Sequence, residues 1–275
     1  MKTLNGRIDF LMLISVDGAN PNGDPLCSGR PRIDTDGHGI ISDVCIKRKL
    51  RNRLSQTGEE IFITPSSLGG DTLSARADQL EYIDSRQFIS GACRKWYDVR
   101  TFGQVFAFNI RTAEHRSLGI RGPVTIQRAR SVHPVEIAES ALTRCINAVS
   151  AGRRNADTFG FKSYVRYGLY VMKGSVCPFR AAETGFDRRD ADKLKDALYS
   201  IFTNDASAAR PEGSMQMKRL YWWQHDAVSG RYPAYRVFET VTPRLREHCT
   251  QPCCFDDYII EESFPDKLVP EIYFT

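Results

Sequence analysis

The sequence predicts an α+β fold with a ferredoxin-like core, the order of elements that RNA-recognition motifs also have. The strongly patterned segments run strand, helix, strand, strand, helix, strand along the chain. Large insertions separate the first helix from the second strand, and the second strand from the third. No Pro-, Gly- or Ser-rich linker and no internal repeat interrupts the 275 residues. We therefore expect a single domain over residues 1–275, with the insertions as appendages of a small sheet.

The first strand is expected over residues 7–17. Apolar side chains alternate along this segment, and Leu11 and Leu13 make its second face apolar as well. A strand that is apolar on both faces is typical of the centre of a sheet.

A loop over residues 17–41 follows, rich in Asp, Asn, Gly and Pro, and leads into a basic helix. The loop has about 25 residues, a length at which structureless loops are usually functional or disordered. Ser42 or Asp43 can cap the helix, which should run to about Thr57. The buried stripe of the helix repeats every fourth residue and consists of Ile46, Leu50 and Leu54.

The same periodicities predict the later core elements. Apolar alternation predicts strands at residues 122–135 and 164–176. Asp187 caps a helix with a clear apolar face, and the last strands are expected at residues 217–224 and 235–241.

The larger insertion covers about residues 58–120. We expect a short strand at residues 60–64, an uncertain stretch after it, and a helix over residues 90–106.

Composition and charge limit the classes of function. With 41% hydrophobic and 26% charged residues the chain resembles an ordinary globular protein, which excludes a collagen, a coiled coil or a disordered chain. The formal net charge of +5 permits a nucleic-acid partner without requiring one. No segment approaches the ~18 apolar residues of a membrane span, so we expect a cytoplasmic protein.

The eight cysteines are scattered, which indicates free thiols in a reducing compartment. One cluster near the C-terminus is tighter and contains His248, Cys249, Cys253 and Cys254. Four such side chains could hold zinc, but their spacing matches no common zinc motif. We therefore predict neither a metal nor a cofactor.

The predicted basic helix is the first candidate RNA-binding segment. No acidic residue interleaves its cations, and phosphate backbones favour such dense, unpaired charge. The alternative is an ordinary solvated helix surface. The helix contributes Lys47, Arg48, Lys49, Arg51 and Asn52, and the loop before it adds Arg30 and Arg32.

Two further segments combine basic side chains with strand patterns. The second candidate contains Arg121, Arg128 and Arg130. In the third, cations stand among aromatic residues, a mixture that suits single-stranded nucleic acid because cations follow the backbone and rings stack on bases. A core hairpin with exposed arginines is the alternative for this segment. Its basic members are Arg153, Arg154, Lys162 and Arg166.

The acidic loop offers a different function. Several carboxylates on one loop could bind Mg²⁺ and cleave phosphodiesters, which makes a metal-dependent ribonuclease using residues 17–43 the alternative hypothesis. Asp is also a residue that turns select, and the spacing fits no metal motif. No nucleotide-binding or nucleophile motif is present, so we predict no catalytic residue. The loop carboxylates are Asp17, Asp24, Asp34, Asp36 and Asp43, with His38 among them.

Several motifs resemble a known family. They are N-P-N-G-D-P at 20–25, R-P-R-I-D at 30–34, G-H-G-I-I-S-D-V-C-I-K-R-K-L-R-N at 37–52, Y-D-V-R-T-F-G at 97–103, R-G-P-V at 121–124, R-S-V at 130–132 and Y-G-L-Y at 167–170. Over roughly residues 6–225 the chain resembles the CRISPR-associated Cas seven family, Csd-two subtype, the guide-RNA-binding backbone subunit of type I-C Cascade.

The resemblance implies an RNA-recognition-motif core shaped like a hand, with fingers at about residues 58–120 and a thumb hairpin at about residues 131–166. In such complexes several copies line up along one CRISPR RNA, and each thumb flips out a base. The basic helix contacts guide phosphates, which maps onto Lys47 and Arg51, and less directly onto Lys49 and Asn52. The implied partners are CRISPR RNA, target DNA, further copies of the chain, and the repeat-end cap, large and small subunits of type I-C Cascade. Type III relatives cleave RNA with an aspartate in the loop before this helix, but type I members are not known for cleavage, so the role is not carried over.

Overall fold

A large antiparallel sheet forms the centre of the molecule in the computed structural model, which describes residues 4–65, 72–107, 117–143 and 159–274. The strands follow one another in the order β12-β9-β1-β8-β6-β2, and β5 and β7 also pair with β8. This arrangement confirms the α+β class. The strands are β1 (Ile8–Ala19), β2 (His38–Ile41), β5 (Val124–Ile126), β6 (Ala129–Pro134), β7 (Ile137–Thr143), β8 (Phe159–Val176), β9 (Met215–Gln224) and β12 (Glu271–Phe274).

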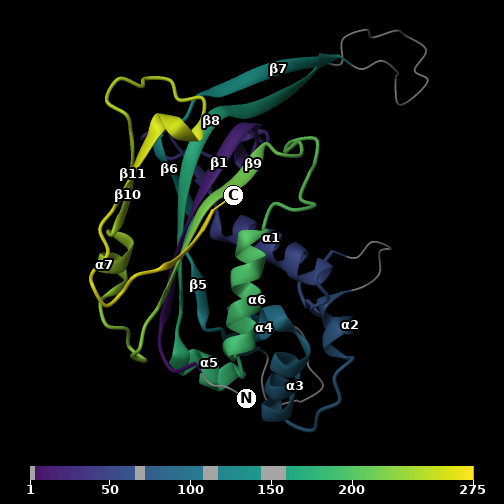
Figure 1. Ribbon diagram of the computed structural model, residues 1–275. Coiled ribbons are helices and arrows are strands. Elements are labelled where there is room, and N and C mark those ends of the chain that lie inside the picture. Colours follow the sequence, from purple (N-terminus) through teal and green to yellow (C-terminus); the bar gives the residue numbers. More distant parts are fainter. Residues whose placement is uncertain (1–3, 66–71, 108–116, 144–158, 275) are drawn as a thin grey trace, which may run out of the picture.

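Two helices cover one face of this sheet, α1 (Asp43–Gln56) and α6 (Arg188–Tyr199) (Figure 1). Ser42 caps α1, and an Asp187–Asp190 capping box begins α6, so both starts lie where the sequence predicts them. Along the chain the elements run β1, α1, β6, β8, α6, β9, which is the expected order. A closer match to RNA-recognition motifs stays a prediction.

The opposite face of the sheet is covered by the C-terminal part of the chain, which contributes α7 (Ala234–Phe238), β10 (Val241–Leu245) and β11 (Tyr258–Glu262) (Figure 1). Leu11 and Leu13 pack against this layer, which explains why β1 is apolar on both sides. The predicted strand at residues 235–241 was wrong. A helical turn begins there after Pro233, whose fixed φ suits a helix start.

The insertion forms a small unit with its own apolar core. Its elements are α2 (Leu73–Ala77), α3 (Ser85–Lys95), α4 (Tyr97–Phe102), β3 (Gly103–Phe106) and β4 (Leu118–Arg121). The aromatic rings of Phe62, Phe88, Trp96 and Phe106 pack together in this core.

Three sequence predictions about boundaries were wrong. The expected helix over residues 90–106 is two helices, because Trp96 adopts an extended backbone (φ −104°, ψ 119°) between them. The expected strand at residues 60–64 is irregular, since its backbone N–H groups are held by a side chain instead of a neighbouring strand. The single strand predicted over residues 122–135 is divided into β5 and β6.

Buried ion pairs attach the insertion to the core helices. The Arg51 Nε atom of α1 donates to Asp98 Oδ2 of α4 at 2.8 Å, and the same carboxylate accepts the N–H groups of Phe62 and Ile63. Asp98 is 1% exposed. Two residues further along α4, Arg100 makes two hydrogen bonds to Asp190 of α6, at 2.8 and 3.0 Å.

Helix α5 (Pro178–Thr184) leads from β8 into α6. Across the described ranges of the chain, no helix is long and apolar enough to cross a membrane.

We expect Asp98→Ala to lower the free energy of unfolding by about 3–5 kcal/mol, because it leaves the guanidinium of Arg51 buried without a partner. Asp98→Asn should be milder, since it keeps an acceptor for the Phe62 N–H group. Urea unfolding followed by circular dichroism measures both.

The control for this experiment is Asp192→Ala, which removes an exposed carboxylate 3.4 Å from Arg188 within α6. Surface pairs of this kind contribute at most about 1 kcal/mol. Equal losses for Asp98→Ala and Asp192→Ala would contradict the anchoring role of Asp98.

Candidate nucleic-acid interface

Two of the basic side chains of α1, Lys49 and Arg51, are largely buried and paired inside the protein, so they do not present the free charge that the sequence suggested. Lys49 is 4% exposed and pairs with Asp205, and burial lowers its pKa. Arg51 pairs with Asp98, and its guanidinium carbon lies 5.2 Å from the ring centroid of Phe102. The partners of these cations come from segments far away in the sequence, so the absence of acids within the helix was misleading.

The remaining predicted residues of α1 are more accessible. Lys47 pairs with Asp43 at 3.2 Å, one turn earlier on the same helix. Arg48 and Asn52 have no hydrogen-bonded or charged side-chain partner among the described residues, and Asn52 is exposed. Arg48 is thus the one cation of this helix with neither a hydrogen-bonded nor a charged side-chain partner among the described residues, where the sequence suggested a row of free cations.

The loop over residues 20–37 is held in place by its own aspartates. Asp34 accepts the N–H groups of Asp36 and His38 and receives a 2.7 Å hydrogen bond from Arg130 Nε. That bond is the main reason why the pKa of Asp34 is lowered. Asp36 lies 3.5 Å from the same guanidinium. The carboxylates that a nuclease would use for metal ions thus shape a turn and neutralise an arginine.

The same loop brings two arginines towards the sheet edge. Arg30 lies 3.3 Å from Glu139 of β7, and Arg32 lies 3.5 Å from Asp24. Both side chains remain partly open, with 52% and 35% exposure. The loop therefore lies beside the base of the β7–β8 hairpin.

The β7–β8 hairpin extends beyond the body of the protein (Figure 1). It lies within the residues predicted to form a thumb. Two of its side chains are exposed apolar groups, Leu142 at 52% and Phe161 at 73%. Of the predicted cations, Lys162 lies in the paired part and Arg166 near its base, where Arg166 contacts Glu136 at 3.1 Å. Arg153 and Arg154 lie outside the described residues.

A cavity of about 510 Å³ opens beside the hairpin base. Its walls come from three distant parts of the chain: the end of β1, the hairpin, and a loop of the C-terminal layer. The lining includes Asp17, His133, Tyr164 and Arg166, and residues 250–253 close one side. This cavity could not be predicted from the sequence, because no local pattern shows that the tail folds back onto the hairpin.

The structure places Arg30, Lys162 and Arg166 on or against the β7–β8 hairpin, and we call these three residues the hairpin-base surface. Arg32 pairs within its own loop, and Arg130 lies further along the sheet, opposite Val171 of β8. Arg121 and Arg128 lie apart from it, on β4 and between β5 and β6. Both are exposed, without side-chain partners in the part of the chain that the structure describes.

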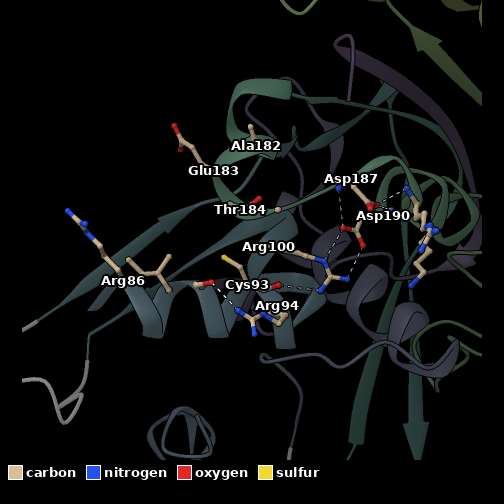
Figure 2. Close-up of a pocket in the computed structure, with 14 residues that line it drawn as sticks. Arg86, Cys93, Arg94, Arg100, Ala182, Glu183, Thr184, Asp187 and Asp190 are labelled. Atoms are coloured by element: carbon tan, nitrogen blue, oxygen red, sulfur yellow. Dashed lines mark hydrogen bonds and ion pairs between the residues drawn. The ribbon is translucent and has the colours of Figure 1, made fainter. Parts of the chain in front are cut away.

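A second cavity, of about 690 Å³, lies between α3 and the α5–α6 turn (Figure 2). Arg100 and Asp190 form its inner wall. Its exposed cations Arg86, Arg94 and Arg189 have no carboxylate partner among the described residues. These cations are dispersed in the sequence and were not predicted as a site.

Comparison with known proteins places the chain in a family. The family model of the CRISPR-associated protein Cas7 matches residues 6–263. The chain belongs to the Cas7 family. A curated Cas7 protein of Haloferax volcanii is 30% identical over 247 residues, which cover 80% of this chain and 70% of that protein.

The fold of this Cas7 family member has a counterpart among solved structures. A chain of a "CRISPR RNA-guided surveillance complex, pre-nicking" superposes with a TM-score of 0.51 at 14% identity, covering 79% of this chain and 75% of the other. At this identity the likeness concerns the fold alone.

We expect Asp34→Ala to expose residues 20–37 to proteases, because the N–H groups of Asp36 and His38 lose their side-chain acceptor and the turn loses its bond to Arg130. Limited proteolysis with mass mapping should show cleavage in this loop several times faster than in the wild type. Thr35→Ala, an exposed neighbour without side-chain bonds, is the control. Unchanged cleavage of Asp34→Ala would mean that other contacts hold the loop.

Proposed function

We propose that the chain is the CRISPR-RNA-binding backbone subunit of a type I-C Cascade surveillance complex. Membership of the Cas7 family over residues 6–263 is the observation that carries this proposal. In the proposed role, copies of the chain assemble along one guide RNA in the cytoplasm and support recognition of target DNA. Its other partners are the repeat-end cap, large and small subunits of the complex.

The hairpin-base surface is the part of the molecule best suited to hold the guide. Its arginines are paired with surface carboxylates and remain partly exposed, so a phosphate can replace the carboxylate at small cost. A guide has to be held whatever its sequence, which requires contacts to phosphate and stacking of bases more than reading of base edges. Tyr164 and the exposed Phe161 supply rings on the same hairpin.

We propose that the chain binds RNA without cleaving it. Asp34 and Asp36 share the guanidinium of Arg130. Within the described residues, the carboxylates of this loop form no cluster with the geometry of a metal site. The ribonuclease hypothesis therefore lacks support from the arrangement of its own residues.

The type I-C assignment rests on the sequence motifs at residues 20–52 and 97–103. Co-purification with the three other type I-C subunits, together with repeat-derived RNA of uniform length, would support it. Recovery with subunits of another type would contradict it.

Charge reversal on the hairpin tests the RNA site. We expect Lys162→Glu/Arg166→Glu to weaken binding of a single-stranded RNA about tenfold at physiological salt. The reason is that binding releases fewer counterions from the RNA when phosphate contacts are lost. The slope of log affinity against log salt should fall by about 1.4, because each single-strand phosphate contributes about 0.7. Fluorescence anisotropy over a salt series measures both quantities.

The control for this pair is Arg236→Glu/Lys267→Glu, which changes the net charge equally at exposed positions of the C-terminal layer. A general loss of charge would affect both double variants alike. If the hairpin variant binds like the wild type, the hairpin-base surface is not the RNA site.

Cleavage is tested separately. Labelled RNA incubated with the wild-type chain and Mg²⁺ should stay intact, because within the described residues the carboxylates of the 17–43 loop form no metal-site cluster. Cleavage that disappears in Asp34→Ala or Asp36→Ala would favour the ribonuclease hypothesis.

A further inference from the structure

The loop between β10 and β11 contains a cluster of possible metal ligands that the proposed function does not use. The thiols of Cys253 and Cys254 and the carboxylate of Asp257 offer ligand atoms that all lie within 4.8 Å of one another. Both cysteines are exposed, so an ion can reach them from solvent.

The backbone holds these three groups in their mutual positions. Asp257 Oδ2 accepts the N–H groups of Cys253 at 2.7 Å and of Cys254 at 3.0 Å, and the turn η2 (Phe255–Asp257) fixes the spacing between them. Hydrogen bonds of this kind orient the ligands of metal sites and limit their movement on binding. The cluster is therefore arranged before any ion arrives.

One sulfur–oxygen distance in the cluster agrees with that expected around a single zinc ion. Cys254 Sγ lies 3.5 Å from Asp257 Oδ2. In a tetrahedral site with Zn–S of about 2.3 Å and Zn–O of about 2.0–2.2 Å, sulfur and oxygen ligands are about 3.6 Å apart, and two sulfurs about 3.8 Å. Two soft thiolates with one carboxylate favour Zn²⁺ over Mg²⁺ or Ca²⁺, which prefer oxygen ligands alone.

We propose that Cys253, Cys254 and Asp257 bind one Zn²⁺ ion. Binding releases the two thiol protons to solvent, so two thiolates and one carboxylate surround the dication. The fourth position is open to water, or to His248 or Cys249. These two residues line a third cavity, of about 540 Å³, together with Asp257. The carboxylate of Asp257 raises the pKa of the Cys253 thiol, and a bound cation would offset this repulsion.

The site would also shape the cavity at the hairpin base. Residues 250–253 line that cavity together with Arg166. Because Cys253 belongs both to the cavity wall and to the ligand set, a bound ion would fix the wall at one end. Zinc would thus stabilise the loop of the C-terminal layer that lies beside the hairpin.

Metal content is the direct test. The full chain, expressed with added zinc and purified under reducing conditions without chelator, should retain about one zinc ion per chain by elemental analysis. Cys254→Ser and Asp257→Asn should each lose most of it. Cys27→Ser, which removes an exposed cysteine outside this loop, should keep it.

Cobalt substitution gives a second readout that does not depend on yield. Titration with Co²⁺ should produce thiolate-to-cobalt charge-transfer absorption and the intense visible bands of tetrahedral coordination. Both should weaken in Cys254→Ser, with circular dichroism showing that this variant is folded. A reduced wild type that retains no zinc, or full binding by Cys254→Ser, would overturn the proposal.

Discussion

The buried ion pair between Arg51 and Asp98 is the contact on which the arrangement of the rest of the molecule depends. One carboxylate that is 1% exposed joins α1, α4 and the backbone of residues 62–63. Because an unpaired charge in such a position costs several kcal/mol, this pair stabilises the packing of the three segments against one another. Arg100 and Asp190 form a second such ion pair, between α4 and α6. The insertion is thereby oriented against both helices of the core.

These buried pairs change the role that the sequence suggests for the cations of the basic helix. Lys49 and Arg51 neutralise acids from other segments, and so they stabilise the protein instead of presenting a positive surface. The accessible positive charge lies further out, on the loop before α1, on the hairpin and on the insertion. The net charge of +5 combines internal ion pairs, which cancel, with cations at the periphery. Its value therefore does not indicate whether the protein has a nucleic-acid partner.

The covered sheet limits where a nucleic acid can bind. Helices α1 and α6 bury one face, and the C-terminal layer buries the other around Tyr221 and Trp223. The strand pattern predicts that Trp222 and Trp223 belong to the core, and they are 2% and 0% exposed. Neither ring is available for stacking on a base. For the proposed contacts to RNA, this leaves the edges of the sheet and the projecting β7–β8 hairpin. The C-terminal loop also lies beside that hairpin.

The sequence by itself determined the elements whose periodicity is strong. Strand β1, the capped helices α1 and α6 and the order of the core elements follow from local apolar spacing and capping residues. Family motifs could also be recognised, although their physical roles could not. Gly39 shows this, since a Cβ atom there would lie 2.1 Å from the hydroxyl oxygen of Tyr170. That contact joins residues far apart in the chain.

The tertiary structure alone decided which charges are free. Arg51 and Lys162 look alike in the sequence, yet one is paired inside the protein and the other lies on a projecting hairpin. The same holds for the C-terminal cluster. Local spacing suggested His248 with three cysteines, whereas the backbone turn brings Asp257 to Cys253 and Cys254. Pairing of the charges depends on distances between segments remote in sequence, and the choice of ligands depends on the conformation of one turn. Both exist only once the chain has folded.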